Sequence, residues 1–254
     1  MEQRISVVIN TYNAEKFLLQ VLETVKDFDE IVICDMESTD KTCEIAESFG
    51  CKIVTFPKEN HVSAEPARTF AIQSASCPWV LVIDADELVT PDLRKALYAH
   101  IAKEGCAEGL WIPRKNFFMG RFMHCHFPDY LLRFFIREGT TWPPYVHTFP
   151  SVNGRLERLT GDKEALALIH LANDSMSSVL KKTDLYTESE VEKKASKNYG
   201  WGALLWRPFF RFFKAYILRG GILDGKEGYI RATSEAFYQI TLLAKVFEHR
   251  KTKQ

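Results

Sequence analysis

The sequence predicts an α/β fold: a doubly wound, mainly parallel sheet followed by a C-terminal helical extension. Apolar runs of strand length alternate with helical patterns over residues 4–104, and this alternation is typical of a parallel sheet. The strand-like runs are apolar throughout, as expected for strands that are buried on both faces. From about residue 175 onward the pattern is helical. The sheet is therefore expected in the N-terminal part of the chain.

The expected elements follow one another in order. Four runs rich in β-branched and aliphatic residues are expected strands: 4–10, 30–35, 51–56 and 79–84. The expected helices are 14–25, 38–50, 64–75 and one that opens at Thr90-Pro91. In the first helix five apolar side chains share one face: Phe17, Leu18, Val21, Leu22 and Val25. Ser38 and Thr39 are expected to cap the second helix, and Gly50 to end it.

Composition and charge exclude several classes of protein. Of the 254 residues, 46% are hydrophobic, which supports a sizeable core and argues against disorder. The formal net charge is zero, from 33 basic and 33 acidic residues, so no overall attraction to nucleic acid is expected. The N-terminus is not signal-like and no apolar run reaches the length of a membrane span, so neither a signal peptide nor a transmembrane helix is expected.

The cysteines and histidines give no sign of a disulfide framework or a zinc site. The six cysteines show no CxxC pair, which favours reduced thiols in a cytoplasmic protein. His124, Cys125 and His126 are adjacent but lack a second ligand pair at the usual spacing. The oligomeric state is left open by the sequence.

A ligand crevice is expected where the strands end. In doubly wound sheets ligands bind beyond the carboxyl ends of the strands, and Asn10, Asp35 and Asp84 lie at those ends. Asp35 could accept hydrogen bonds from a base or a ribose. The residues at 38–40 have the composition of a helix cap, so we assign capping to them and ligand contact to Asp35.

The stretch WVLVIDADELV, residues 79–89, ends a buried strand in several carboxylates. A carboxylate at the edge of a core is costly unless it is solvated, paired or bound to a cation. One interpretation of Asp84 and Asp86 is a solvated turn that leads to the helix at Pro91. The other is a site for a divalent cation and a diphosphate, because Mg²⁺ usually takes one or two carboxylates together with phosphates. The three preceding strand–helix units favour the second interpretation.

Up to Glu87 the chain resembles the family 2 glycosyltransferases. The resemblance rests on SVVINTYNAEKFL, EIVICDMESTDKT and ARTFAIQSASCPWVLVIDADE, in that order. It implies the GT-A nucleotide-sugar fold, a nucleotide-sugar donor and a divalent cation, Mn²⁺ or Mg²⁺. The donor-site residues that it implies are Thr11, Asn13, Asp35, Arg68, Asp84 and Asp86. The first three would hold the base and ribose, Arg68 would lie near the nucleotide, and the two last would hold the metal and the sugar diphosphate.

The rest of the chain resembles the bacterial lipopolysaccharide core glycosyltransferases. The matching stretches are DADE, DYLLRFF, VHTF, LIH and PFFRFFKAYILRGGILDGKEGYIRA. This resemblance implies an acceptor that is a lipopolysaccharide core or another envelope glycan. The expected organisation is a catalytic domain over 1–175, with a nucleotide-sugar half up to about residue 104 and an acceptor half over 105–175. A helical region that could associate with a membrane follows over 176–254.

An inverting transfer needs a base for the acceptor hydroxyl and a Lewis acid for the leaving diphosphate. Asp129 is the candidate base, since it precedes LLRFF where related enzymes present an acidic residue to the acceptor; the alternative is a surface aspartate after Pro128. Arg133 is expected to pair with the diphosphate or with Asp129. His147 is a candidate ligand of metal or phosphate, and His170 is expected in the core or at a helix end.

Residues 204–220, LLWRPFFRFFKAYILRG, combine aromatic and basic side chains. On a helical wheel Arg207, Arg211 and Lys214 share one face. The opposite face holds Trp206, Phe209, Phe210, Phe213, Tyr216 and Ile217. This pattern is typical of a helix that lies on an anionic membrane, and the alternative is a core-packing helix with a cationic solvent face. A lipid-anchored acceptor favours the first, at the inner face of the bacterial cytoplasmic membrane.

The predicted function is therefore an inverting, metal-dependent transfer of a hexose from a nucleotide sugar, UDP-linked, to an envelope glycolipid. A polyprenyl phosphate or another glycan is the alternative acceptor. A sugar nucleotidyltransferase would need a Gly-rich basic loop after the first strand, and NTYNAEKF has no glycine. The alternative of another class is a noncatalytic nucleotide-sugar-binding protein, against which the intact Asp84, Asp86 and Asp129 argue.

Overall fold

The computed structural model describes residues 3–61, 63–145, 148–197 and 199–252. The chain divides into two compact units. One, here called the sheet unit, consists of Met1–Lys115 and Pro128–Leu171; the other, the helical unit, consists of Asn116–Phe127 and Ala172–Gln254. The helical unit thus takes in a segment from the middle of the chain that nothing in the sequence pattern marks as part of it.

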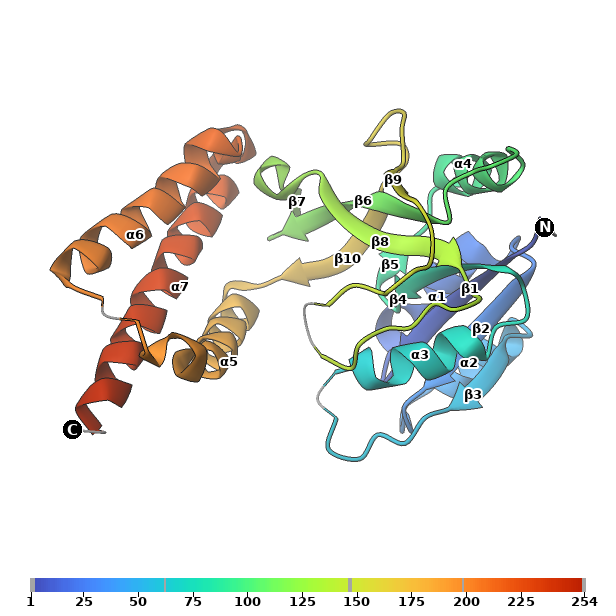
Figure 1. Ribbon diagram of the computed structural model, residues 1–254, viewed down its shortest axis with the longest axis horizontal. Coiled ribbons are helices and arrows are strands. Elements are labelled where there is room, and N and C mark those ends of the chain that lie inside the picture. Colours follow the sequence, from blue (N-terminus) through green and yellow to red (C-terminus); the bar gives the residue numbers. More distant parts are fainter. Residues whose placement is uncertain (1–2, 62, 146–147, 198, 253–254) are drawn as a thin grey trace. The chain divides into compact units, whose positions relative to one another are not determined.

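The first strands form a parallel sheet, as the sequence predicts (Figure 1). These strands are β1 (Ile5–Thr11), β2 (Glu30–Asp35), β3 (Lys52–Thr55) and β4 (Trp79–Asp84), in the spatial order β3-β2-β1-β4. The helices between and after them are α1 (Glu15–Val25), α2 (Thr42–Ser48), α3 (Glu65–Gln73) and α4 (Pro91–Ile101). Each of these elements lies where the sequence places it to within a few residues, α2 excepted.

Beyond β4 the sheet becomes mixed: β8 (Asp129–Ile136) is antiparallel to both β4 and β6 (Gly109–Phe118), whereas β9 (Leu156–Arg158) is parallel to β6. The row continues through β8, β6, β10 (Leu168–Asp174) and β5 (Glu87–Leu88), while β7 (Arg121–Phe122) and β9 pair with β6. The sequence reads as irregular where β6 and β8 lie, because neither strand alternates cleanly between buried and exposed residues.

The parallel strands are buried on both faces, which explains their continuous apolar character. Alternate residues face opposite sides: Ile9 packs in one cluster with Leu18 of α1, and Val8 packs in another with Ala71 of α3. Four of the five apolar residues expected on one face of α1 are buried: Leu18, Val21, Leu22 and Val25. Thr90 caps α4 by accepting the amide hydrogen of Leu93, at 3.1 Å.

The start of α2 differs from the prediction. The helix begins at Thr42 and not near Ser38, because Ser38 is engaged elsewhere: its amide and its hydroxyl both donate to the Asp35 carboxylate, at 2.8 and 2.6 Å. Asp40 accepts the amide hydrogen of Thr42 instead, at 3.0 Å. Gly50 has a φ of 66°, as expected for the residue that ends a helix.

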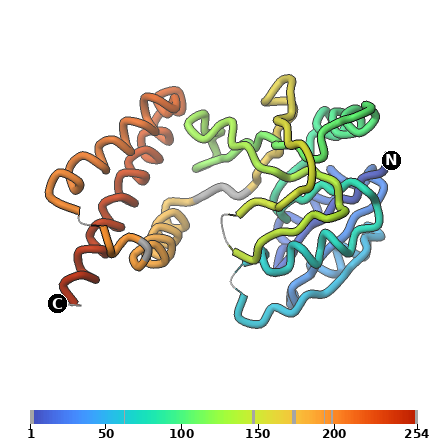
Figure 2. The backbone as a smooth tube through the Cα atoms, in the orientation of Figure 1, coloured from blue at the N-terminus to red at the C-terminus, as the bar shows by residue number. Residues whose placement is uncertain are grey.

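The helical unit is built around its last helix. Its elements are η1 (His124–His126), α5 (Met176–Ala195), α6 (Trp201–Phe213), the π-helical turn η2 (Lys214–Leu218), the 3-10 turn η3 (Gly221–Asp224) and α7 (Gly225–Thr252). Both α5 and α6 pack along α7 (Figures 1 and 2). The helix expected over 204–220 consists of two segments, because α6 ends at Phe213 and the π-helical turn η2 follows it. Gly228 allows η3 and α7 to cross closely, because a Cβ there would overlap the carbonyl oxygen of Gly221. Among the described residues, no helix is long and apolar enough to cross a bilayer.

Candidate active site

The register of the parallel strands brings the predicted residues to one edge of the sheet. Thr11 at the end of β1 pairs with Asp35 at the end of β2, and Asn10 pairs with Asp84 at the end of β4. Because the three strands are neighbours in the order β2-β1-β4, their carboxyl ends meet at the same edge. This is where ligands bind in doubly wound sheets.

Asp35 is held by three hydrogen bonds from its own chain. The hydroxyl of Thr11 donates to it at 2.8 Å, and Ser38 donates through its amide and its hydroxyl. Asp35 is only 3% exposed, so these donors offset the cost of burying its charge. The bonds also fix the loop that follows β2 against the end of β1.

Asn13 fastens the same two loops together. Its amide donates to the hydroxyl of Ser38 at 2.9 Å, and its side-chain oxygen accepts the amide hydrogen of Thr39 at 2.8 Å. Beside it Tyr12 is 49% exposed, with the ammonium group of Lys58 at 4.9 Å from its ring centre. The sequence reading did not single out Tyr12. Its signal was an aromatic residue placed directly after a strand end, next to Thr11.

Asp84 lies between two arginines that come from distant parts of the chain. Nη2 of Arg68 on α3 lies 2.8 Å from one carboxylate oxygen, and Nη2 of Arg133 on β8 lies 2.6 Å from the other. Although burial alone would raise it, Arg133 and Arg68 hold the pKa of Asp84 well below its usual range. The reverse holds for Arg133: burial lowers its pKa, but Asp84 and Glu87 raise it above the usual value. Asp84 is therefore ionised at any physiological pH.

Arg68 has donor atoms that make no hydrogen bond within the described residues. Its Nε and Nη1 atoms are buried and have no hydrogen-bond partner among the described residues, and the same is true of Oε2 of Glu65 and Nε1 of Trp142. The ring of Trp142 stacks on the Arg68 guanidinium, with 4.6 Å between the ring centre and Cζ. Buried polar atoms are nearly always satisfied in native proteins. This group of unsatisfied atoms beside Asp84 is what a bound polar ligand or ordered water would complete.

The three acids of the DADE stretch have three different surroundings. Glu87 is fully buried and accepts from Arg114 at 3.0 Å and from the amide of Asp84 at 3.0 Å. The carboxylate of Asp86 lies 3.4 Å from Nε2 of His170 on β10. His170 was expected in the core or at a helix end; it lies on a strand, partly exposed, beside an acid of the site. The sequence predicts a positive partner for the carboxylates at this edge. In large part that partner is the protein's own arginines, Arg68, Arg114 and Arg133.

Asp129, the candidate base, begins β8 and joins the same network. Both Nε and Nη2 of Arg114 donate to one of its oxygens, at 3.1 and 2.8 Å. Burial lowers the pKa of Arg114, but Glu87 and Asp129 raise it above the ordinary value. Arg114, not Arg133, is therefore the ion-pair partner of Asp129. Through Arg114 and Glu87 the candidate base is linked to the arginines around Asp84.

Asp86 and His170 are the candidate ligands for a divalent cation among the described residues. In this arrangement both oxygens of Asp84 accept from arginines. Within the described part of the chain no three His, Cys, Asp or Glu side chains converge on one point, and His147 lies outside the described residues. An oxygen donor and a nitrogen donor 3.4 Å apart at the edge of the site nevertheless suit a hard or borderline cation whose other ligands are phosphate oxygens.

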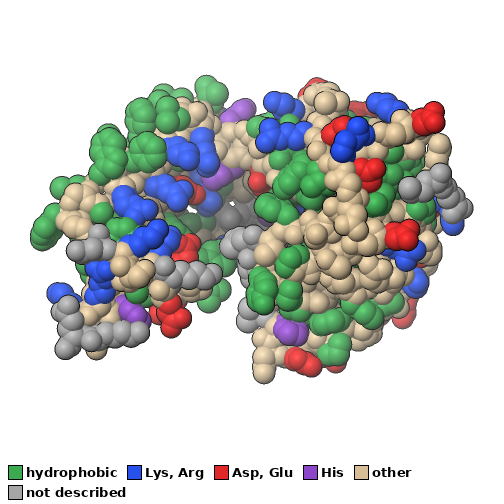
Figure 3. All heavy atoms as spheres, in the orientation of Figure 1, with side chains coloured by type: hydrophobic (Ala, Val, Ile, Leu, Met, Phe, Trp, Pro, Cys, Tyr) green, Lys and Arg blue, Asp and Glu red, His purple; other side chains and the backbone are tan. Residues whose placement is uncertain are grey.

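The helical unit carries a second candidate site of a different kind. Along α6, Leu205, Trp206 and Phe209 are 75%, 62% and 58% exposed. Further exposed apolar residues continue this surface: Trp201, Phe210, Phe213, Ile217, Leu218, Ile222 and Leu223. We call it the α6 surface. Figure 3 shows hydrophobic side chains along one edge of α6 and Lys and Arg side chains along the other. Most of the aromatic residues of this helix are exposed, whereas Phe212 and, in η2, Tyr216 pack against Tyr229 of α7.

The fold is of the GT-A glycosyltransferase type. The mannosyltransferase PcManGT from Pyrobaculum calidifontis, solved in complex with GDP-Man and Mn²⁺, superposes with a TM-score of 0.57 at 14% identity and covers 96% of this chain and 87% of that one. The chain belongs to glycosyltransferase family 2, whose profile, Glycosyl transferase family 2, matches residues 6–158.

Relatives of similar length support the same assignment. An uncharacterized glycosyltransferase of Rickettsia bellii is 26% identical over 98% of this chain and 87% of its own length. The lipopolysaccharide core biosynthesis glycosyltransferase LpsC of Rhizobium meliloti is 26% identical over 98% of this chain and 94% of its own length. The resemblance drawn from the sequence motifs is thereby confirmed, and the protein is an enzyme of the glycosyltransferase class.

Proposed function

We propose that this enzyme is an inverting, metal-dependent hexosyltransferase that uses a nucleotide sugar, UDP-linked, and acts on a lipopolysaccharide core or another envelope glycan. The observation that carries the proposal is the edge after β4, where Asp84 pairs with Arg68 and, two residues on, Asp86 lies beside His170. It offers unsatisfied cationic donors and a pair of cation ligands side by side, which is what a sugar diphosphate requires. The name of the Rhizobium meliloti relative supports the acceptor class.

In this proposal the loops after β1 and β2 receive the nucleoside. Asp35 and Thr11 sit at the floor, Asn13 fixes the two loops, and the exposed ring of Tyr12 offers a platform on which a base can stack. Lys58, which lies over the same ring, adds a positive charge near the entry. The nucleoside would thus be held mainly by parts of the chain that are already fixed by hydrogen bonds.

The diphosphate would lie between Arg68 and the Asp86–His170 pair. The free Nε and Nη1 of Arg68 donate to phosphate oxygens, and Arg133 holds Asp84 so that the edge keeps its shape. Asp86 and His170 would hold the cation, which when bound acts as a Lewis acid for the leaving diphosphate. The arginine pairs around Asp84 cost no reorganisation during the reaction, since they are formed beforehand.

Asp129 would act on the acceptor. Its carboxylate takes the proton of the acceptor hydroxyl, the hydroxyl oxygen forms a bond to the anomeric carbon, and the bond to the nucleoside diphosphate breaks. Arg114 fixes Asp129 through two contacts to one oxygen, which sets the direction of the carboxylate. A single displacement of this kind inverts the configuration of the anomeric carbon.

The proposal is tested by a donor screen. Purified protein is mixed with UDP-sugars and then GDP-sugars, with Mn²⁺, Mg²⁺ or a chelator, and nucleoside diphosphate release is followed with and without a deacylated core oligosaccharide. We expect release with one donor, dependence on the cation, and an inverted product by NMR. A retained configuration, or full turnover in chelator, would contradict the mechanism.

We further propose that the α6 surface attaches the enzyme reversibly to an anionic membrane. Exposed tryptophan and phenylalanine side chains bury apolar area in the headgroup region, and Arg207, Arg211 and Lys214 lie beside them. Each basic residue near such a surface contributes about 1 kcal/mol. A lipid-linked acceptor would then be presented at the surface on which the enzyme rests.

A further inference from the structure

The basic residues of α6 and the first residue of η2, Lys214, do not form a flat stripe but line a cleft. This cleft, between α6 and α7, has a volume of about 390 Å³. Its lining residues are Trp206, Arg207, Phe210, Arg211, Lys214 and Gln239. Gln239 of α7 is buried, at 4% exposed, and adds an amide to the wall of the cleft. Three cations and an amide around one hollow are more than a helix needs for solubility.

Two of the three cations have no acid to neutralise them. In the described part of the chain neither Arg207 nor Lys214 has a carboxylate within 4.0 Å. Arg207 stacks on the ring of Tyr199, with 5.0 Å from Cζ to the ring centre, which leaves its donors available. A cation–π contact of this kind orients the guanidinium without cancelling its charge.

The third cation is only partly neutralised. Arg211 lies 3.8 Å from the carboxylate of Glu235, which is shared with Arg231 at 3.7 Å. Glu190, the other acid near Arg211, forms an ion pair with Lys194 and accepts a hydrogen bond from Tyr238 at 2.6 Å. The carboxylates around the cleft therefore have cationic partners of their own, and the cleft keeps a net positive charge.

The ligand chemistry follows from what borders the cleft. Trp206 and Phe210 line it and also belong to the α6 surface, where Figure 3 shows the hydrophobic and the basic side chains running side by side. A ligand that satisfies both must carry a compact anion joined to apolar chains. Arginine and lysine donors around a hollow suit phosphate oxygens, and a phosphomonoester carries about −1.5 to −2 charges near neutral pH.

We infer that the cleft between α6 and α7 is a binding site for the phosphate headgroup of an anionic lipid and prefers a phosphomonoester over a phosphodiester. The inference rests on the proposed membrane attachment, to which it adds a defined site with headgroup selectivity, and it is independent of the sugar transfer. Arg207 and Lys214 donate to the phosphate, while the aromatic side chains of α6 lie among the acyl chains.

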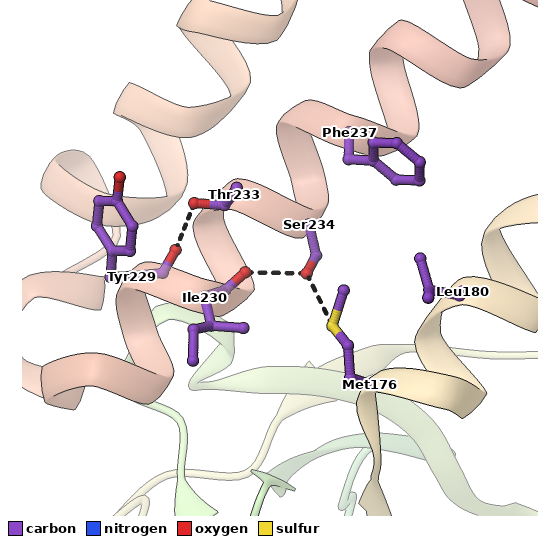
Figure 4. Close-up of a pocket in the computed structure, with 7 residues that line it drawn as sticks. All are labelled: Met176, Leu180, Tyr229, Ile230, Thr233, Ser234 and Phe237. Carbon is purple, nitrogen blue, oxygen red and sulfur yellow. Dashed lines mark hydrogen bonds between the residues drawn. The ribbon is translucent and has the colours of Figure 1, made fainter.

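A second groove in the same unit is mainly apolar and serves as a comparison for the cleft (Figure 4). It has a volume of about 310 Å³ and is lined by Met176, Leu180, Tyr229, Ile230, Thr233, Ser234 and Phe237. Two of its hydroxyls are already bonded: Thr233 donates to the carbonyl of Tyr229 and Ser234 to that of Ile230, both at 2.9 Å. None of these lining residues is a lysine or an arginine, so this groove offers a phosphate no cation, in contrast to the cleft.

The test compares two lipids and two variants. Phosphatidylcholine vesicles contain either phosphatidic acid, a phosphomonoester, or phosphatidylglycerol, a phosphodiester, at equal measured surface potential, and binding of the full chain is followed by flotation. The double variant Arg207→Gln/Lys214→Gln removes two charges from the cleft. Its matched control, Arg219→Gln/Lys226→Gln, removes two exposed charges of the same unit that do not line the cleft. Thermal unfolding checks that both variants fold.

We expect wild type to bind the phosphatidic acid vesicles several-fold more tightly than the others. The cleft variant should lose that preference and about 30-fold in affinity, at about 1 kcal/mol for each lost charge, whereas the control keeps the preference. Equal losses in both variants, or no preference in wild type, would overturn the inference in favour of unspecific charge attraction. Glycerol 3-phosphate is the soluble competitor: if it displaces the protein at equal concentration to lipid phosphate, the site serves a free phosphate compound. Flotation requires no donor or acceptor, so a failed transfer assay leaves this result intact.

Discussion

The sheet unit and the helical unit treat their charges in opposite ways. At the edge of the sheet Asp84, Glu87 and Asp129 each accept from an arginine, so the charges fix one another. In the helical unit, Arg207 on α6 and Lys214 on η2 lack such partners among the described residues and lie beside exposed aromatic side chains. Internal pairing gives a site its geometry before the ligand arrives. Cations that have no acidic partner and lie beside apolar surface can instead bind an external anion. The sheet unit is therefore suited to catalysis, and the helical unit to attachment.

The largest effect is expected at Asp86. Asp86→Ala should abolish cation-dependent transfer and weaken Mn²⁺ binding, because one of the two candidate protein ligands is removed. The measurement is turnover across a series of Mn²⁺ concentrations, together with Mn²⁺ binding by calorimetry. Asp92→Ala, an exposed acid of α4, is the matched control. Near wild-type turnover of Asp86→Ala at limiting metal would show that the cation is held elsewhere.

The next largest effect is expected at Asp129. Asp129→Asn keeps the size of the side chain but cannot take a proton, so turnover should fall about 100-fold or more while donor binding survives. Single-turnover rates and donor affinity, measured on the same preparation, separate the two. An Asn variant as active as wild type would move the base elsewhere; Glu138 would be tested first, since Glu87 is fully buried and paired.

The comparison between the units also shows how far the sequence could be read. The parallel strands and their positions along the chain were predictable because continuous apolar runs, turn residues and capping residues are local signals. The edge residues Asp35 and Asp84 could be placed for the same reason, since each directly follows such a run. Their assigned roles as ligand contacts remain predictions.

The rest depends on contacts between distant parts of the chain. Arg114 and Asp129 come together only because β6 and β8 pair in a certain register, and no local pattern reports that register. His170 meets Asp86 through the pairing of β10 with β5, which is why the sequence placed this histidine in the core or at a helix end. The amphipathic character of α6 was readable from its period, but the cleft that it forms with α7 was not.

A third prediction asks whether the helical unit depends on its cations. Reversing Arg207, Arg211 and Lys214 to Glu should weaken flotation with anionic vesicles by at least about 100-fold, at about 1 kcal/mol for each lost charge. High salt should release wild type only in part, because it screens the charges and leaves the apolar contacts. The helical content and unfolding temperature of the variant serve as controls. Equal flotation of variant and wild type would show that α6 is not a membrane-binding element.

The smallest effect is expected for the stability of the fold, and it tests whether the ion pairs of Asp84 with Arg68 and Arg133 stabilise the protein without a ligand. Asp84→Asn leaves Arg68 and Arg133 without their shared acid, and since Asp84 is partly exposed the loss in stability should be about 1–3 kcal/mol. The arginines depress the pKa of Asp84, so its stabilising effect is fully present above the unfolded pKa of about 4 and is lost as pH falls through the lower folded value. Denaturant unfolding of both proteins between pH 7 and pH 3 should therefore show a constant difference down to about pH 4–5 and a shrinking one below. If the difference in the free energy of unfolding is absent at pH 7, or grows on acidification, the ion pairs of Asp84 with the arginines do not stabilise the fold. The arginines would then serve ligand binding alone.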